Sequence, residues 1–266
     1  MSKPALQGLL KHRHLIWSLA LREIQGRYRG SFGGVVWSFI NPLIMLGVYT
    51  FVFSFVFQAR WGVSSGSRVE FALILFLGMI TYGVFAEAVN RSPSLIVSNP
   101  NLVKKVVFPL EVLPIAVLIA AVFHLLISLL AWTIIYVAFI GMPWPTLLLF
   151  PLVLAPLLLV TLGLSWIFAS IGVFIRDATQ FATILTTILL FMSPIFYPIS
   201  ALPEAYRFVL WLNPLTPVIE QVRAVAYWGA LPDPLNWAIS VLVGIVTAGV
   251  GYFFFQRTRK GFADVL

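Results

Sequence analysis

The chain has 266 residues, of which 10% are charged and 61% are hydrophobic, and its mean hydropathy is +1.00. Soluble domains carry about a quarter charged residues, so this composition excludes an ordinary soluble enzyme and indicates an integral membrane protein. The absence of cysteine excludes disulfides and thiolate metal sites. A net charge of +8 suggests nucleic acid in a soluble chain, but here its meaning depends on where the basic residues lie.

A basic amphipathic segment precedes the first long apolar run, and we expect residues 1–30 to form a helix in the cytoplasmic membrane interface. Its apolar residues recur at steps of three and four, and basic residues line the opposite side. Gly30, Gly33 and Gly34 allow the chain to turn from the surface into the membrane. The helix is either a plain anchor or also part of a substrate entrance.

The apolar runs predict six membrane spans, because a helical crossing takes about 20 residues. Five runs are long enough, near 35–57, 71–90, 110–140, 146–174 and 235–256, and a sixth near 180–197 is borderline. With a cytoplasmic N-terminus, the basic residues on the opposite side are only Arg60, Arg68, Arg207 and Arg223. The positive-inside rule therefore predicts both termini in the cytoplasm and implies no nucleic acid. We expect no cleaved signal peptide, since the first run is too long for one.

The stretch VSNPNLVKKVVFPLE interrupts the apolar sequence between the second and third spans, on the cytoplasmic side. Pro93, Pro100 and Pro109 prevent a continuous helix here and allow only a short helical piece around residues 94–103. A short helix at the membrane surface is suited to passing a partner's movement to the spans. Lys104 and Lys105 are equally explained as topology determinants.

Prolines gather again between residues 191 and 234, where a simple span is excluded. We expect two short helices, one over 203–212 and one with Thr216 as N-cap, Pro217 at the first helical position and Gly229 near its end. Both lie on the non-cytoplasmic side and dip back into the membrane. Irregular backbone at that depth must pack in protein or line a cavity, so the pair is a candidate lid, with passive packing as the alternative.

Few ionisable residues fall within the expected spans, which argues against an ion-coupled carrier. Glu87, Glu111, Arg176 and Asp177 lie near cytoplasmic span ends, the last two in a tight turn between the fourth and fifth spans. His124 is left as the ionisable residue well inside, and a hydrogen bond between helices is favoured for it over a proton relay.

Aromatic rings within the spans have two competing roles, since they pack against lipid and also stack on sugar rings. Lipid packing is favoured for any single ring, and a glycan path would use some of them. The mid-span rings considered are Tyr49, Phe53, Trp132, Tyr136 and Trp166.

No catalytic or metal-binding pattern is evident in the sequence. A G-x-x-x-x-G-K-[ST] phosphate loop is absent, so an ATPase must be another chain. His12 and His14 are two residues apart, which places them on different sides of a helix and prevents them from sharing a metal.

Several blocks together resemble one family. The stretches RYRGS with GGVVWSFINPL, NPNLVKKVVFPLEVLP, FIRDATQF, SPIFYPISALPEAYR and NPLTPVIEQVRAV occur in the order found in the permease subunit of bacterial polysaccharide exporters of the ATP-binding cassette class. The resemblance covers nearly the whole chain. One departure is Leu110 between Pro109 and Glu111, where the family commonly has Arg, so an ion pair of that Arg would be absent or rebuilt.

The resemblance implies roles for three groups of residues. A coupling helix over 94–103 would dock on the ATPase subunit, and two helices over 203–228 would form a periplasmic gate. Arg27 and Arg29 would contact a lipid diphosphate, or equally bind ordinary anionic lipid. The coupling residues are Ser98, Asn99, Pro100, Asn101, Leu102, Lys104 and Lys105, and the gate residues are Pro203, Glu204, Arg207, Pro214, Pro217, Glu220 and Arg223.

We therefore expect an all-α integral membrane protein, with an interface helix over 1–30 and a transmembrane domain over 31–266. The resemblance implies a bacterial inner-membrane subunit that exports a polyprenyl-diphosphate-linked polysaccharide, as in lipopolysaccharide biosynthesis. Two copies would face each other above two ATPase subunits, which would bind ATP and Mg; this chain would bind no cofactor or metal. The alternatives are a drug or small-lipid exporter of the same architecture and an ion-coupled carrier.

Overall fold

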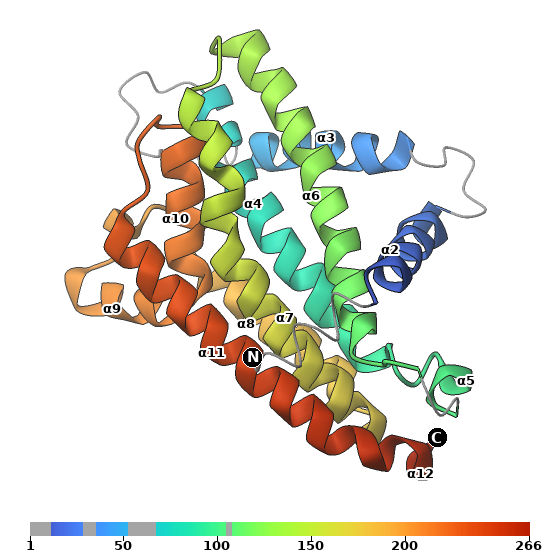
Figure 1. The fold of residues 1–266 in the computed structure, drawn as a ribbon. Coiled ribbons are helices and arrows are strands. Elements are labelled where there is room, and N and C mark those ends of the chain that lie inside the picture. The colour runs from blue at the N-terminus through green and yellow to red at the C-terminus, as the bar shows by residue number, and fades with distance from the viewer. Residues whose placement is uncertain (1–11, 29–35, 53–67, 105–107) are drawn as a thin grey trace.

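The computed structural model describes residues 12–28, 36–52, 68–104 and 108–266, and within them every regular element is a helix (Figure 1). The longer helices are α2 (Arg13–Tyr28), α3 (Val36–Thr50), α4 (Arg68–Arg91), α6 (Val112–Phe139), α7 (Phe150–Phe174), α8 (Ala178–Phe191), α9 (Glu204–Leu212), α10 (Leu215–Ala226) and α11 (Pro234–Thr258). The short helices are η2 (Ser92–Ser94), α5 (Pro100–Val103), η3 (Pro145–Leu149), η4 (Ile199–Ala201), η5 (Arg259–Gly261) and α12 (Phe262–Val265).

In the described part of the chain, four helical stretches are long and apolar enough to cross a membrane. They are Val69–Ser94, Val112–Phe139, Pro145–Phe174 and Pro234–Val265, which confirms the expected second, third, fourth and last spans. The other two expected spans coincide with shorter apolar helices. The 14 residues of α8 rise only about 21 Å, less than the hydrocarbon core of about 30 Å. The 15 residues of α3 cover the first part of the run 35–57, and the rest lies outside the described residues.

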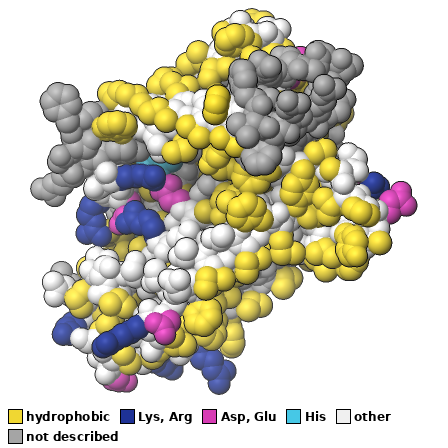
Figure 2. Space-filling view, turned by 180° about the vertical axis from the view of Figure 1, so that it is seen from behind, with side chains coloured by type: hydrophobic (Ala, Val, Ile, Leu, Met, Phe, Trp, Pro, Cys, Tyr) yellow, Lys and Arg dark blue, Asp and Glu magenta, His cyan; other side chains and the backbone are white. Residues whose placement is uncertain are grey.

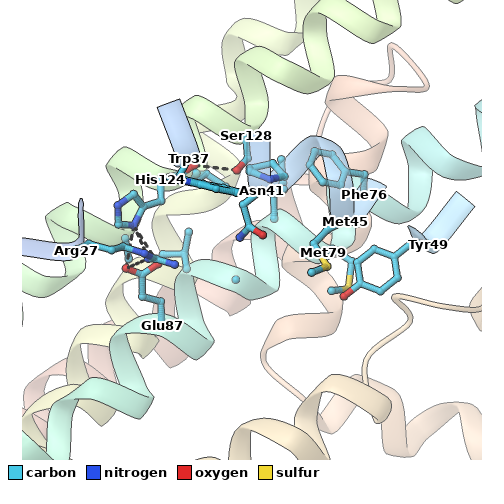
Figure 3. A pocket seen from close by; sticks show the side chains of 16 residues that line it. Arg27, Trp37, Asn41, Met45, Tyr49, Phe76, Met79, Glu87, His124 and Ser128 are labelled. Carbon is cyan, nitrogen blue, oxygen red and sulfur yellow. Dashed lines mark hydrogen bonds and ion pairs between the residues drawn. The ribbon is translucent and has the colours of Figure 1, made fainter. Parts of the chain in front are cut away.

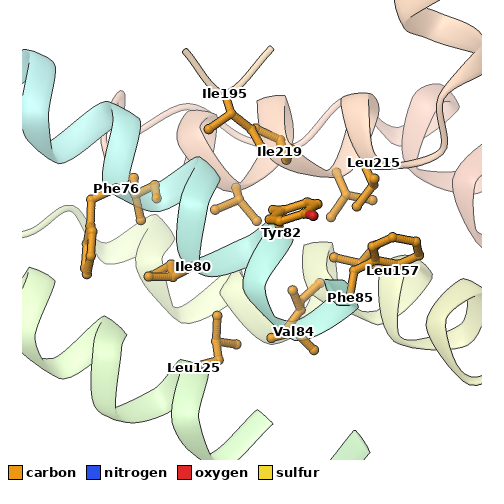
Figure 4. Close-up of a cluster of buried hydrophobic side chains, with 14 of the residues drawn as sticks. Phe76, Ile80, Tyr82, Val84, Phe85, Leu125, Leu157, Ile195, Leu215 and Ile219 are labelled. Carbon is orange, nitrogen blue, oxygen red and sulfur yellow. The ribbon is translucent and has the colours of Figure 1, made fainter. Parts of the chain in front are cut away.

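Helix α4 forms the centre of the molecule. It packs against α3, α6, α7, α8 and α10, and Leu73, Leu77 and Phe85 are completely buried. Figure 4 shows how side chains of α4 meet Leu125 of α6, Leu157 of α7 and residues that follow α8. A helix that is apolar on every side is suited to such a position, because none of its faces needs water. By contrast, much of α11 is exposed.

Small residues allow α7 and α11 to cross closely. A Cβ atom on Gly251 would clash with the carbonyl oxygen of Gly163, and one on Gly163 would clash with the carbonyl oxygen of Thr247. Close backbone approach through glycine is a common way for helices to associate in lipid, where no hydrophobic effect drives apolar surfaces together. This contact attaches the last span to the rest of the bundle.

The chain alternates between two ends of the molecule, and basic residues gather at one of them (Figure 2). At that basic end, Arg259 bonds to the Glu111 carboxylate at 2.8 Å and to the Phe108 carbonyl at 2.8 Å, and Arg91 of α4 pairs with Glu23 of α2. Glu111 thus has a cationic partner although Leu110 replaces the family's Arg. The tight turn expected at Arg176 and Asp177 lies between α7 and α8, as predicted.

The opposite end is held by side chains that bond to backbone. The Thr146 hydroxyl donates to the Val225 carbonyl at 2.6 Å, and the Trp237 indole donates to the Leu152 carbonyl at 2.9 Å. Gly229 follows α10 with a φ of +67°, a conformation that explains glycine there. The sequence predicted Gly229 near the end of this helix, and the structure confirms it.

The proline-rich region forms two short helices as expected, but the start of the second is corrected. Helix α10 begins at Leu215, and its first turn contains both Thr216 and Pro217, so Thr216 is not the N-cap. The Asn213 carboxamide oxygen accepts from the Leu215 backbone N–H at 3.0 Å and does the capping. Pro217 is tolerated because backbone N–H groups of a first turn have no partner within the helix.

Candidate functional site

A cavity of about 570 Å³ lies between α3, α4, α6 and the end of α2 (Figure 3). It is shaped by helices that cross rather than run side by side, as Figure 1 shows for α3 against α6. Its described lining residues are Arg27, Trp37, Asn41, Pro42, Met45, Tyr49, Phe76, Met79, Ile80, Gly83, Val84, Glu87, Ala121, His124, Leu125 and Ser128.

Three polar side chains meet at one side of this cavity. Arg27 Nη1 lies 2.7 Å from Glu87 Oε1, and His124 Nδ1 lies 2.9 Å from the same oxygen. Arg27 Nη1 and His124 Nδ1 are themselves 3.0 Å apart. Glu87 therefore joins α2, α4 and α6 at a single carboxylate. The bond between helices predicted for His124 is confirmed, whereas its partners were not foreseen.

A polar groove of about 720 Å³ adjoins the cavity and shares Arg27 and Glu87 with it. The other groove residues are Arg22, Glu23, Gly26, Ala86, Asn90 and Arg91. The Arg27–Glu87 pair therefore stands at the junction between the two spaces. Its arginine is about half exposed, with a relative side-chain accessibility of 45%, so the guanidinium remains accessible to an anion that enters the groove.

The inner part of the cavity is amphiphilic. Trp37 and Tyr49 offer aromatic faces, Met45 and Met79 offer adaptable apolar surface, and Asn41 offers an amide (Figure 3). Such a surface accepts either a hydrocarbon chain or a sugar ring, while the arginines of the groove attract a negatively charged group. Together the two spaces suit an amphiphile with an anionic head group.

Most of the mid-span aromatic rings lie elsewhere. Trp132 and Trp166 are completely buried and Tyr136 is nearly so, which corrects the expectation that such rings pack against lipid. The Trp132 indole donates to the Leu73 carbonyl at 3.0 Å, and the Trp166 indole donates to the Glu111 carbonyl at 3.0 Å. Of the rings considered, Tyr49 lines the cavity, and Phe53 lies outside the described residues.

The segment expected to couple with an ATPase is more broken than predicted. Instead of one helix over 94–103, the chain forms η2, a turn and the four-residue α5, whose first residue is Pro100. Ser98, Asn101 and Lys104 are exposed, whereas Leu102 is half-buried. The Asn99 amide donates to the Leu95 carbonyl at 2.9 Å and so has a role within the segment. Lys105 lies outside the described residues. So does Arg29, which was expected together with Arg27 to contact a diphosphate.

The root of this segment is fixed against α7. Ser92 and Pro93 are buried, and the Pro93 carbonyl occupies the place that a Cβ atom on Gly172 would need. Ile96 is also completely buried. The segment is therefore anchored at its start and exposed at its tip.

The predicted gate residues fall into two groups. Pro203 and Pro214 precede α9 and α10, and Pro217 lies in the first turn of α10. Arg207 donates to the Leu202 carbonyl at 3.0 Å, and its pair with the exposed Glu204 is long, at 3.6 Å. Arg223 is different, because it is 1% exposed and bonds to Glu220 and to three backbone carbonyls. Its burial was missed from the sequence.

Among the described residues, no group of three or more His, Asp or Glu side chains is placed to hold a metal ion. Asp233 has a structural role that the sequence analysis missed. Its carboxylate caps α11 by accepting from the Leu235 backbone N–H at 2.9 Å and from the Asn236 backbone N–H at 3.4 Å.

The apolar helices, with an amphiphilic cavity among them, define a multi-pass membrane protein. The chain belongs to the ABC-2 type transporter family, which matches residues 14–227. It is the membrane subunit of such a transporter and not its ATPase. This confirms the resemblance seen in the sequence.

Similar proteins cover almost the whole chain. The O-antigen export system permease protein RfbA of Myxococcus xanthus is 31% identical over 263 residues, which are 97% of this chain and 98% of that protein. RfbA of Klebsiella pneumoniae is 26% identical, with 92% of each chain covered. The polysialic acid transport protein KpsM of Escherichia coli is 24% identical, with 96% of this chain and 97% of KpsM covered.

Proposed function

We propose that this chain is the membrane-spanning subunit of an ATP-driven exporter that moves a polyprenyl-diphosphate-linked polysaccharide of the O-antigen type across the bacterial inner membrane. The names of its relatives support a polysaccharide, since RfbA is described by O-antigen export and KpsM by polysialic acid transport. An O-antigen is favoured because the RfbA proteins are the more similar of the two.

One observation supports this proposal above all: the groove and the cavity share the Arg27–Glu87 pair. The pair lies towards the basic end of the molecule, which the positive-inside rule assigns to the cytoplasm, where lipid-linked glycans are built. A diphosphate would displace the Glu87 carboxylate from the guanidinium of Arg27. The first isoprene or sugar units would then contact Trp37 and Tyr49. Arg29, which lies outside the described residues, is kept from the sequence as a second candidate for contact with the diphosphate.

The remaining architecture follows the family resemblance. The proposed topology has six crossings, with the shorter apolar helices α3 and α8 assigned to the two that lack a long span, and both termini face the cytoplasm. Helices α9 and α10 form a gate on the outer side. One bundle of this size leaves little room for a polymer, so two copies face each other and enclose the path.

The energy source is a separate ATPase subunit, present in two copies, that binds ATP and Mg. The exposed tip formed by Ser98, Asn101 and Lys104 docks on it, and Leu102 supplies an apolar contact. Closure of the ATPase pair then moves the segment and the spans rooted to it.

Reconstitution of the permease with its ATPase in lipid vesicles tests the proposal. Short lipid-linked glycan, a lipophilic dye and a proton gradient are supplied separately, and transport of each is measured. We expect ATP-dependent movement of the glycan alone. ATP-dependent transport of the dye without glycan would indicate a drug or small-lipid exporter. Transport driven by the gradient without ATP would indicate an ion-coupled carrier, for which the Glu87–His124 pair would be the natural proton site.

A deletion strain provides the matching test in cells. Loss of the gene should leave completed lipid-linked glycan on the cytoplasmic side and none at the surface. Normal surface glycan in this strain would overturn the proposed substrate.

A further inference from the structure

Arg223 occupies a position that is costly for a charged side chain. A buried guanidinium is tolerated only when its N–H groups are bonded, because its removal from water is strongly unfavourable. Here Arg223 Nε donates to the Ile74 carbonyl at 3.1 Å, Nη2 donates to the Ile195 carbonyl at 3.0 Å, and Nη1 donates to both the Pro194 carbonyl and Glu220. The side chain is therefore fixed in one direction.

These bonds join three separate parts of the chain. Ile74 belongs to α4, Pro194 and Ile195 lie in the loop after α8, and Arg223 itself lies on α10. Asn213 strengthens the same unit, since its amide donates to Ser193 Oγ at 2.9 Å while its oxygen caps α10. The loop 192–195 and α10 consequently form one polar-bonded unit, and the Arg223–Ile74 bond links that unit to α4.

Helix α4 has a glycine, Gly78, where the guanidinium of Arg223 lies against it. A Cβ atom on Gly78 would lie 2.7 Å from Arg223 Nη2 and 3.5 Å from the Ile195 side chain. Apolar packing between α4 and the unit also exists, as Ile195 and Ile219 show in Figure 4, and Glu70 of α4 contacts Tyr227 at the end of α10, but neither contact is a hydrogen bond to the backbone of α4 like the one that Arg223 makes near Gly78. The planar guanidinium fork, seated over Gly78, fixes the register.

Helix α4 also leads directly to residues 92–104, called the docking segment for the ATPase contact proposed above. Ile74 and Arg91 are both in α4, about 26 Å apart along the helix axis, and η2 follows at once with Pro93 braced on Gly172. We infer that Arg223 is a positioning residue that makes the loop 192–195 and α10, and with them the proposed gate, move together with α4 when the docking segment is displaced. This inference rests on the proposed function, in which an ATPase displaces that segment.

Two conservative variants test the link from its two sides. R223K keeps the charge but lacks the fork, and G78A keeps the arginine but takes the space of Nη2. Each should fold and bind the ATPase normally, yet export about tenfold less glycan per ATP hydrolysed, the loss expected for one hydrogen bond of a charged group. The matched control is G249A, the same substitution in α11, where a Cβ atom meets nothing within 4 Å.

A second readout follows the movement itself. The chain lacks native cysteine, so a single S200C substitution in η4 reports accessibility of the outer side through its labelling rate. In the complex with ATPase, nucleotide should change this rate in the S200C protein and in its G249A derivative, and the change should be lost with R223K or G78A. In the R223K background, G78A should have little further effect, because R223K has already removed the guanidinium that G78A displaces.

The outcomes separate the inference from the proposed function. A nucleotide-dependent labelling rate that persists in folded R223K and G78A proteins, with normal export, would overturn the inference alone. A rate that nucleotide does not change even in the S200C protein would overturn the moving gate and the inference together. Should one variant fail to fold, the other decides, since each changes a different side of the contact.

Discussion

The carboxylate of Glu87 shows how one residue determines the character of the candidate site. It lies 2.7 Å from Arg27 and 2.9 Å from His124, on helices far apart in the sequence. With Glu87 ionised, Arg27 is partly neutralised, so an entering anion must compete for it. If the groove binds a diphosphate as proposed, Glu87 would compete with that anion for Arg27.

The first prediction tests this competition with farnesyl diphosphate as a short probe. R27Q should weaken its binding about tenfold, the loss expected for one charge-assisted hydrogen bond. E87Q should strengthen binding by up to about fivefold, the value of a partly exposed ion pair. Binding to the purified protein is measured by calorimetry, and R176Q, which removes a charge from the exposed α7–α8 turn, serves as the control. Equal effects of R27Q and R176Q would remove Arg27 from the site.

For single residues, the sequence predicted the kind of interaction better than the partner that makes it. His124 was correctly expected to bond between helices, but Glu87 could not be named as its partner, because pairing depends on how each helix is rotated. The same rotation decides that Trp132 and Trp166 face the interior. One signal for the buried Arg223 was available, namely a Glu three residues earlier in the otherwise apolar pattern of α10.

Among the elements, the α7–α11 crossing depends most clearly on single residues. Gly163 and Gly251 place two backbones in contact, and nothing between them is able to shift. The long apolar spans were predicted from hydropathy because that property is local. Which of their glycines lie at a contact is not local, and Gly249, two residues before Gly251, is in open space.

The second prediction compares these two neighbours. G251A should lower the free energy of unfolding by on the order of 1–3 kcal/mol, since an inserted methyl group must separate the helices. G249A should be neutral or slightly stabilising, because alanine is the better helix former. Reversible unfolding in detergent measures both, and a G251A protein as stable as G249A would contradict the described packing.

The third prediction separates the two asparagines of the docking segment. Asn101 is exposed, so N101A should weaken binding of the ATPase several-fold, in line with about 1 kcal/mol for a lost contact. N99A removes the bond to the Leu95 carbonyl, so it should speed hydrogen exchange of the backbone amides that follow Leu95. T179A, at an exposed position at the start of α8, is the control for binding. Undiminished affinity of N101A would place the ATPase contact elsewhere.

The ends of the short elements were the least predictable. Thr216 and Pro217 fit an N-cap and first helical position by type, but Asn213 took the capping role and α10 started earlier. Similarly, three prolines signalled a broken segment after α4, yet not that its root would rest on Gly172. Which of several neighbouring residues caps or ends a helix depends on packing against distant parts of the chain, and the local sequence does not contain that information.

For the molecule as a whole, the uneven distribution of charge expected from the sequence is also seen in the structure. Basic side chains gather at one end, where α2, the docking segment and the C-terminal residues also lie (Figures 1 and 2). The family and the helical architecture were therefore accessible from the sequence, whereas the cavity was not, because it results from the crossing of α3 over α4 and α6.

The fourth prediction concerns orientation. A cysteine in place of Ser200 should react with a membrane-impermeant thiol reagent in spheroplasts, and one in place of Ser98 should react only after the membrane is opened. Both positions are exposed, so burial does not explain a difference between them. Labelling of S98C from outside would reverse the topology and with it the docking role.

The contrast between the anchored start and the exposed tip of the docking segment has an evolutionary consequence. The contact of Pro93 with Gly172 fixes where the segment leaves the bundle, whereas Ser98, Asn101 and Lys104 are exposed and take no part in that contact. If these three residues contact the ATPase as proposed, its recognition would depend on the exposed tip and not on the anchored start. A change of ATPase partner would then need substitutions at the exposed tip alone, without a change in the packing of the spans.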